Sequence, residues 1–242
     1  MVQFEVFSVR KILLYFIGFL ATNFSFAQTI TVDQSTYTVE ELIRDVLINS
    51  PCAEVSNITF STGTNFGSEN GIGYFDGNGS VFPFAEGILL TTGNAGAAEG
   101  PENETLSQGS LSWPGDAELE AAINTDLDGF PGDDLVAGES TNATFIEFDF
   151  TPQSDFISFN FVFASEEYGQ FQCQFSDAFA FLLTDTVTGK KSNLALVPGT
   201  NTEVSVFTVR DATFNATCTS ENPEFFDSYY GNPNGLPAED SP

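Results

Sequence analysis

The residues best suited to chemistry in this 242-residue chain are carboxylates. Glu166 and Glu167 follow an apolar segment directly, and Asp177 stands at the start of the next one. Ca²⁺ takes roughly six to eight oxygen ligands, and a loop between consecutive strands can bring such groups together. We therefore predict a calcium site formed by these three residues. The alternative is that the two glutamates are solvated at the rim of a sheet and that Asp177 caps a turn.

A second acidic segment, residues 124–134, opens like an EF-hand calcium loop. It reads NTDLDGFPGDD, with oxygen-bearing side chains at the first, third and fifth positions and glycine at the sixth. The motif then fails, because Leu135 stands where a bidentate glutamate is needed. A degenerate calcium loop that uses Asp126, Asp128 and Asp133 and a plain acidic turn are both consistent with this pattern.

Catalysis by histidine is excluded, because the chain contains no histidine. This removes the Ser-His-Asp and Cys-His arrangements and the HExxH zinc site. Glu147 and Asp149 lie on one face of a predicted strand, like the acid pairs of sandwich-fold glycosidases. The third carboxylate of that pattern would fall at Pro152, and outward acids on a half-buried strand need no catalytic role. We expect no enzyme activity, with polysaccharide hydrolysis through Glu147 and Asp149 as the alternative.

Two aromatic residues, Trp113 and Tyr168, offer flat faces on which sugar rings can stack. Packing in the core or at its rim is the commoner role of such side chains. We interpret them as candidate ligand-stacking residues of a glycan-binding protein.

The composition is strongly acidic, with 34 acidic and 6 basic residues and a formal net charge of −28. Such a chain repels phosphate backbones and anionic lipid headgroups, so we expect no nucleic-acid or membrane-surface binding. Divalent cations would be attracted. Solubility outside the cell is the simplest reason for most of the carboxylates.

The first 27 residues have the pattern of a secretory signal peptide. Two basic residues precede the apolar run 12–21, and Ser25 and Ala27 are the small residues that a signal peptidase reads. A membrane anchor is the alternative, but the run has about half the length needed to span a bilayer. We therefore predict cleavage after Ala27, a secreted or cell-surface location, and no membrane span in the mature chain.

The three cysteines, Cys52, Cys173 and Cys218, are an odd number for an exported protein. One disulfide fits an oxidising compartment, and three pairings are possible. The remaining thiol suggests a missing partner. Metal ligation by cysteine is less favoured, because the three are far apart and no CxxC motif occurs.

Alternating apolar residues indicate the strands that must position these groups. The clearest segments are 143–150, 155–169 and 176–183. Their apolar face includes Ile146, Phe148, Phe150, Ile157, Phe159, Phe161 and Phe163. Each buried side chain of this kind contributes roughly 1.5–3 kcal/mol, so a second layer must cover them. We predict an all-β fold, an antiparallel β-sandwich of jelly-roll or lectin-like type.

Further elements complete this predicted domain. Strands are expected at 53–61, 71–75, 87–92, 192–197 and 204–209. An N-terminal helix should begin after Thr38, with Glu41 closing a capping box. A short second helix at 116–122 should be capped by Asp116.

Several blocks of this sequence together resemble the choice-of-anchor L domain. They are GILLTTG (87–93), GDAEL (115–119), IEFDF (146–150), FASEEY (163–168), SDAFAF (176–181) and VPGT (197–200). The resemblance implies a secreted or surface bacterial protein, of a kind common in Bacteroidetes that use type IX secretion. Domains of that family continue further, so we expect residues 28–242 to be one domain, truncated at its C-terminus.

The expected function is a secreted or cell-surface binding and adhesion module, glycan-recognising and stabilised by calcium. Its partner would be an extracellular glycan or a surface protein.

Overall fold

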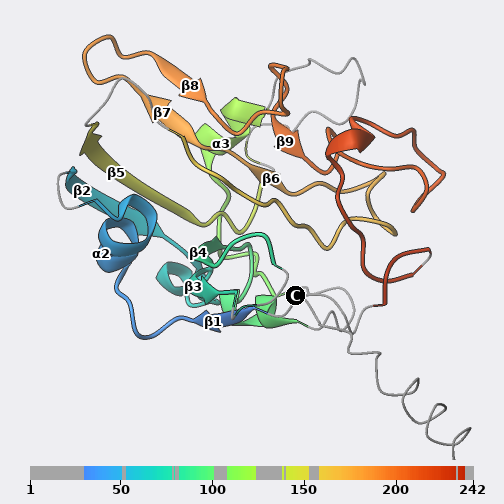
Figure 1. Cartoon of the computed structure of the whole chain (residues 1–242), viewed down its shortest axis with the longest axis horizontal. Coiled ribbons are helices and arrows are strands. Elements are labelled where there is room, and N and C mark those ends of the chain that lie inside the picture. The colour runs from blue at the N-terminus through green and yellow to red at the C-terminus, as the bar shows by residue number, and fades with distance from the viewer. Residues whose placement is uncertain are drawn as a thin grey trace, which may run out of the picture.

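The computed structural model describes residues 30–50, 53–77, 79, 82–100, 108–123, 138, 140–152, 158–232 and 234–237. Within these residues the chain is mostly strands in four small antiparallel sheets, with short helices between them (Figure 1). The strands are β1 (Thr31–Asp33), β2 (Glu54–Ser61), β3 (Ile72–Asp76), β4 (Glu86–Leu90), β5 (Phe145–Thr151), β6 (Ala178–Phe179), β7 (Leu182–Thr184), β8 (Lys191–Asn193) and β9 (Val204–Ser205). The helices are α2 (Val39–Glu41), η1 (Leu42–Ile48), η2 (Gly63–Phe66), η3 (Ala95–Glu99), α3 (Ala117–Ile123) and η4 (Pro223–Phe225).

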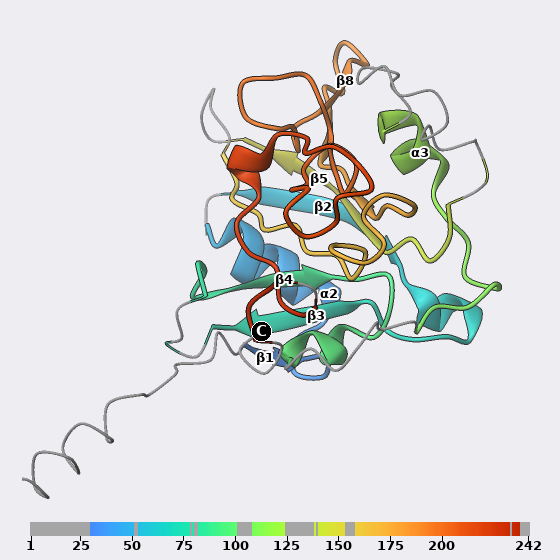
Figure 2. The same cartoon turned by 90° about the vertical axis from the view of Figure 1, so that its right-hand side faces the viewer.

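Two sheets are built from the N-terminal half and β5. One has the order β1-β3-β4, and the other pairs β2 with β5. The α2–η1 helix lies between them in both views (Figures 1 and 2). Leu42 and Ile43 of η1 are buried, and the Arg44 Nη2 donates to the Val55 carbonyl oxygen of β2 at 2.8 Å. The helix therefore fixes β2 against the three-stranded sheet.

The predicted N-terminal helix and its capping box are confirmed. The Thr38 Oγ1 accepts from the Glu41 N–H at 3.2 Å, and the Glu41 Oε2 accepts from the Thr38 N–H at 2.7 Å. The helix continues as a π-helical turn and ends at Asn49, whose φ of 41° is left-handed. The second helix, α3, begins after Asp116, whose Oδ1 accepts from the N–H groups of Glu118 and Leu119 at 2.9 Å.

The alternation predicted for residues 146–150 is confirmed in β5. Its residues alternate between exposed and half-buried along the whole strand. The register with β2 shifts between Ser56 and Thr59, which marks an irregularity in the ladder. Asn57 lies at this irregularity and has a left-handed φ of 52°. Asparagine tolerates this backbone conformation better than most residues do.

The strand segment predicted over 155–169 is not a ladder-forming strand in its described part, residues 158–169. The burial still alternates, with Phe159, Phe161 and Phe163 half-buried between exposed neighbours. Phe159 stacks on Phe181 with ring centroids 4.0 Å apart, and Phe161 contacts Phe179 at 5.2 Å. The segment thus runs antiparallel to residues 179–181 and is held there by aromatic packing. The periodicity identified the buried face but not the hydrogen-bond pattern.

The C-terminal strands are shorter than predicted. Residues 176–183 divide into β6, paired with β9, and β7, paired with β8. The Asn193 Oδ1 accepts from the N–H groups of Phe181 and Ala195, which ends the β7–β8 ladder. After β9, the Thr208 Oγ1 donates to the Glu203 carbonyl oxygen and turns the chain. Side-chain hydrogen bonds here replace the ladder bonds that longer strands would have made.

These sheets correct the predicted architecture in one respect. The fold is all-β with short helices, as expected, but the described strands do not form two closed sheets of a sandwich or jelly roll. A buried apolar cluster of Val197, Val204 and Val209 lies under Phe161, Phe163 and Phe226. The core is therefore shared between extended segments and loops as well as strands.

Candidate functional site

The predicted calcium cluster is only partly brought together. The Ser165 Oγ donates to the Asp177 Oδ2 at 2.6 Å and accepts from the Glu167 N–H at 3.1 Å, so Glu167 and Asp177 are neighbours. Partial burial, and then the nearby Asp177 carboxylate, raise the pKa of Glu167 above its usual value. Yet the described residues contain no group of three or more acidic, cysteine or histidine side chains that could hold a metal ion. Glu166, Glu167 and Asp177 therefore do not form the three-carboxylate site that the sequence suggested.

The second predicted calcium segment cannot be compared with the structure. Asp126, Asp128 and Asp133 lie outside the described residues.

The acid pair of β5 lies on an exposed strand face. Glu147 and Asp149 are both exposed, opposite Thr59 and Ser56 of β2. The Asp149 Oδ2 accepts from the Asn57 Nδ2 at 2.6 Å. The Asp149 carboxylate therefore already has a structural partner, at the irregularity of the β2 strand.

Trp113 does not present a face for a ligand, which corrects the sequence-based prediction. Its side chain is 0% exposed, and its Nε1 donates to the Ala143 carbonyl oxygen at 2.8 Å. The ring also packs directly against Gly63, where an added Cβ would lie 2.6 Å from it. Trp113 is a core residue that joins η2 to the start of β5.

Tyr168 is half-buried in a chain of aromatic contacts. Its ring meets Phe163 at 6.4 Å and Phe226 at 4.9 Å, both edge to face. Burial, and then the Asp177 carboxylate, raise the pKa of the Tyr168 hydroxyl far above its usual value. These contacts give Tyr168 a packing role beside the Glu167–Asp177 pair.

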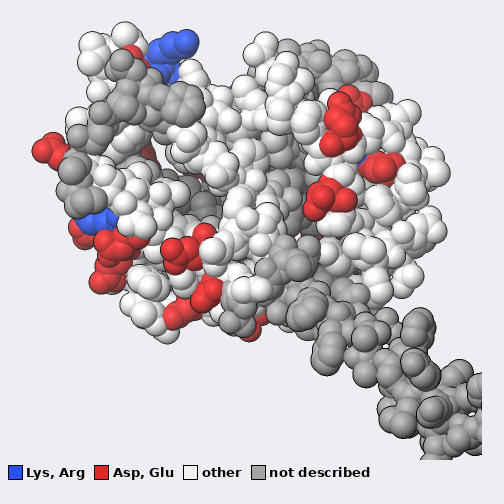
Figure 3. All heavy atoms as spheres, viewed as in Figure 1, with Lys and Arg blue, Asp and Glu red and all other residues white. Residues whose placement is uncertain are grey.

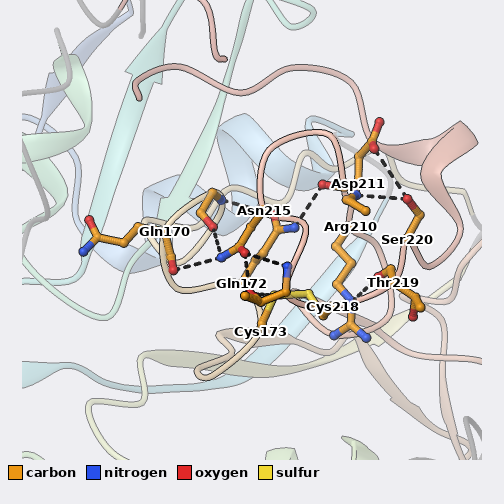
Figure 4. The surroundings of a disulfide bond; sticks show 12 residues. Gln170, Gln172, Cys173, Arg210, Asp211, Asn215, Cys218, Thr219 and Ser220 are labelled. Carbon is orange, nitrogen blue, oxygen red and sulfur yellow. Dashed lines mark hydrogen bonds between the residues drawn. A yellow bond between two sulfur atoms is a disulfide. The ribbon is translucent and has the colours of Figure 1, made fainter. Parts of the chain in front are cut away.

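The predicted disulfide is present and joins Cys173 to Cys218, with a Cα–Cα distance of 5.6 Å. It links the segment around Gly169 to the loop after β9 (Figure 4). Gln172, which is completely buried, accepts from the Gly169 N–H and donates to the Asp211 carbonyl oxygen. Cys52, the third cysteine, lies outside the described residues.

A hollow of about 450 Å³ opens beside this disulfide-linked pair of loops. It is lined by residues 169–170, residues 213–216, Asn232 and Asn234. No acidic or basic side chain belongs to this lining, although the molecule carries 34 acidic residues. Sequence reasoning missed this site. The available signal was local enrichment in amide and hydroxyl residues, as in TFNAT at 213–217 and the asparagines at 232 and 234.

Acidic side chains far outnumber basic ones on the face shown in Figure 3. Two ion pairs occur among the described residues, Arg44 with Glu40 at 2.9 Å and Lys191 with Glu118 at 2.7 Å. Both are exposed, so each contributes little to stability. The charged side chains of this surface are therefore mostly acidic, and the lining of the hollow contains none of them.

An all-β domain of small antiparallel sheets, braced by a disulfide, is the structural class that these observations define. The model of the Choice-of-anchor L domain matches residues 31–240 of the chain. The chain belongs to this family, whose name indicates a surface-associated bacterial module. The comparison with curated proteins found no match, and neither did the comparison with solved structures.

The described residues contain no helix that is both long and apolar enough to cross a membrane.

Proposed function

We propose that the chain is a secreted or cell-surface binding and adhesion module that recognises an extracellular glycan. The observation that carries this proposal is the match to the Choice-of-anchor L domain over residues 31–240. The disulfide between Cys173 and Cys218 supports an oxidising compartment, which fits export. The uncharged, amide-lined hollow supports a neutral, hydroxyl-rich ligand over a charged one.

The proposed role is binding without catalysis. Asp149 accepts a hydrogen bond from Asn57, and both Asp149 and Glu147 are exposed. The strand face of β5 leaves both carboxylates open to solvent. Hydrolysis of polysaccharide through Glu147 and Asp149 is the competing proposal.

Export and calcium belong to the same proposal. The signal pattern in residues 1–27 supports cleavage after Ala27. The net charge of −28 supports a stabilising role for Ca²⁺, because a divalent cation relieves repulsion between carboxylates.

The test combines binding and turnover on the same polysaccharides. The purified chain is applied to an array of neutral and acidic glycans, and the retained glycans are then incubated with it and analysed for released sugars. Retention without release is the expected result. Release of sugars that stops in the variant Glu147→Gln would favour the hydrolase, and the absence of retention on every glycan would overturn glycan recognition.

A further inference from the structure

The hollow beside the disulfide has walls that are fixed before any ligand arrives. The Asn215 Nδ2 donates to the carbonyl oxygens of Gly169 at 2.8 Å and Gln170 at 3.1 Å. The Asn234 Nδ2 donates to the Thr213 carbonyl oxygen at 3.2 Å. Each of these bonds joins two of the segments that line the hollow. Because the walls are bonded to one another, little backbone conformational entropy remains to be lost on binding.

The disulfide network holds the base of the same walls. Gly169 has a φ of 73°, and its Cα approaches the Tyr229 hydroxyl so closely that a Cβ would lie 2.2 Å from it. The Tyr229 hydroxyl donates in turn to the Asn232 carbonyl oxygen at 2.9 Å. Buried Gln172 connects the turn at Gly169 to Asp211, before Phe214, and the Cys173–Cys218 bond connects it to the segment after Phe214 (Figure 4).

Two amide side chains at the hollow are not used by this framework. The Asn215 amide is fully engaged, since its Oδ1 also accepts from the Thr217 N–H at 3.1 Å. The Gln170 side chain is exposed and extends away from the Asn215 and disulfide network (Figure 4). Asn232 is exposed as well, and its backbone carbonyl oxygen accepts the hydrogen bond from the Tyr229 hydroxyl. Gln170 and Asn232 line the hollow and are exposed, so we assign the ligand-contacting amides to them, while Asn215 acts as a positioning residue.

An aromatic ring completes the lining. Phe214 is half-buried and packs on Phe226 at 5.4 Å and on Tyr229 at 5.0 Å. These contacts fix the orientation of its ring in the wall of the hollow. An amide both donates and accepts hydrogen bonds, as a hydroxyl does, and an aromatic face packs against apolar C–H groups.

We propose that this hollow is the binding site for a neutral sugar residue of the glycan, contacted by Gln170, Asn232 and Phe214. This rests on the proposed glycan recognition and assigns it a location. Because no carboxylate lines the hollow, a metal ion is disfavoured, since such ions prefer carboxylate ligands. A basic peptide is disfavoured as well, because it would need carboxylates to pair with its positive charges. An anionic ligand would also meet the repulsion of a chain with a net charge of −28. The volume of about 450 Å³ falls in the range of small-molecule sites, roughly 300–1,000 Å³.

The test follows the side-chain amides directly. The intact chain, labelled with ¹⁵N, is titrated with glucose, galactose, mannose, xylose and N-acetylglucosamine, and with any glycan retained on the array. The NH₂ signals of Gln170 and Asn232, assigned by their loss in Gln170→Ala and Asn232→Ala, are expected to shift to saturation with at least one probe. The double variant should weaken that binding tenfold or more.

A matched control keeps the result specific to the hollow. Gln174→Ala removes another exposed amide that does not line the hollow, so it should leave binding unchanged. If a glycan binds but neither amide signal moves, the site is overturned while glycan recognition stands. If no probe moves these signals and the array retains nothing, both proposals are overturned. An unchanged affinity in the double variant would also refute the site.

Discussion

Some aspartates of the described residues cap turns rather than form a site. Asp33 accepts from the N–H groups of Ser35 and Thr36, and Asp185 does the same for Val187 and Thr188. Hydrogen bonds hold the pKa of each carboxyl below its usual value. The largest cause is the Thr36 side chain for Asp33 and the Thr188 N–H for Asp185. Part of the acidity is therefore explained by local backbone geometry.

Glu167 differs from these capping residues, because its pKa is raised by burial and by Asp177. A raised folded-state pKa means that the folded chain binds the proton more tightly than the unfolded chain. Stability is then higher at a pH below the unfolded value of about 4.3 and falls as the pH rises through the folded value. We expect Glu167→Gln to raise the melting temperature slightly at pH 7, and the difference from the parent chain to disappear near pH 4.

The measurement is a series of thermal melts between pH 4 and pH 8. The exposed Glu224→Gln serves as control and should show no such pH-dependent gain. A gain for Glu167→Gln that is equally large at every pH would contradict the linkage.

Trp113 provides a second prediction at this scale, because it is the single tryptophan of the chain. Trp113→Phe removes the Nε1 donor from the Ala143 carbonyl oxygen and leaves a cavity next to Gly63. We expect a loss of about 2–4 kcal/mol in the free energy of unfolding, measured by denaturant titration followed by circular dichroism. In the parent chain the tryptophan emission should be shielded from acrylamide and unaffected by bound glycan. Quenching by a sugar would restore Trp113 as a ligand contact.

At the scale of elements, local signals predicted the structure better than signals that depend on partners. The capping box of Thr38 and Glu41, the Asp116 cap and the alternation in β5 are all present. They were predictable because each depends on residues within a few positions of one another or on a single buried face.

The errors come from residues whose partners are distant in sequence. Residues 158–163 keep the predicted burial, but their neighbours across the contact are Phe179 and Phe181, and no ladder forms. Asn193, the last residue of β8, ends the β7–β8 ladder by accepting from the Phe181 N–H. Periodicity shows which face is buried and carries no information about which backbone groups pair. Trp113 was misplaced for the same reason, since its partners Gly63 and Ala143 are remote in the chain.

The disulfide is the element that joins the two loops of the candidate site. It closes a loop with a sequence separation of 45 residues between Cys173 and Cys218. The double variant, Cys173→Ser with Cys218→Ser, should have a free energy of unfolding that is about 2–5 kcal/mol lower. The main cause is that the unfolded chain gains conformational entropy when the bond is removed. Denaturant titration with and without reductant measures this difference.

The third cysteine supplies the control for that experiment. Cys52→Ser should keep the full effect of reductant, because the bond does not involve Cys52. Mass spectrometry after alkylation without reduction should find one modified cysteine, Cys52. Loss of the reductant effect in Cys52→Ser would show that a different pairing forms in solution.

The whole molecule carries a large excess of negative charge. The −28 net charge is opposed by few cations, and the two ion pairs among the described residues are exposed. Repulsion of this kind destabilises the compact state and is screened by salt. The amide-lined hollow has no charged side chain in its lining. This is consistent with a neutral ligand held by hydrogen bonds.

Calcium should stabilise the molecule by more than screening alone. CaCl₂ and NaCl screen charges equally at matched ionic strength. A specific calcium site would raise the melting temperature further in CaCl₂, because Ca²⁺ binds the folded chain by mass action. We expect CaCl₂ to give a higher melting temperature than NaCl, and a chelator to abolish the excess. The acidic segment 124–134, which opens like an EF-hand calcium loop, is the part of this prediction that variants can test directly. Asp126→Asn with Asp128→Asn should remove the excess, while Asp227→Asn, at an exposed position, should not. Equal melting temperatures in the two salts would leave these carboxylates as ordinary surface charge.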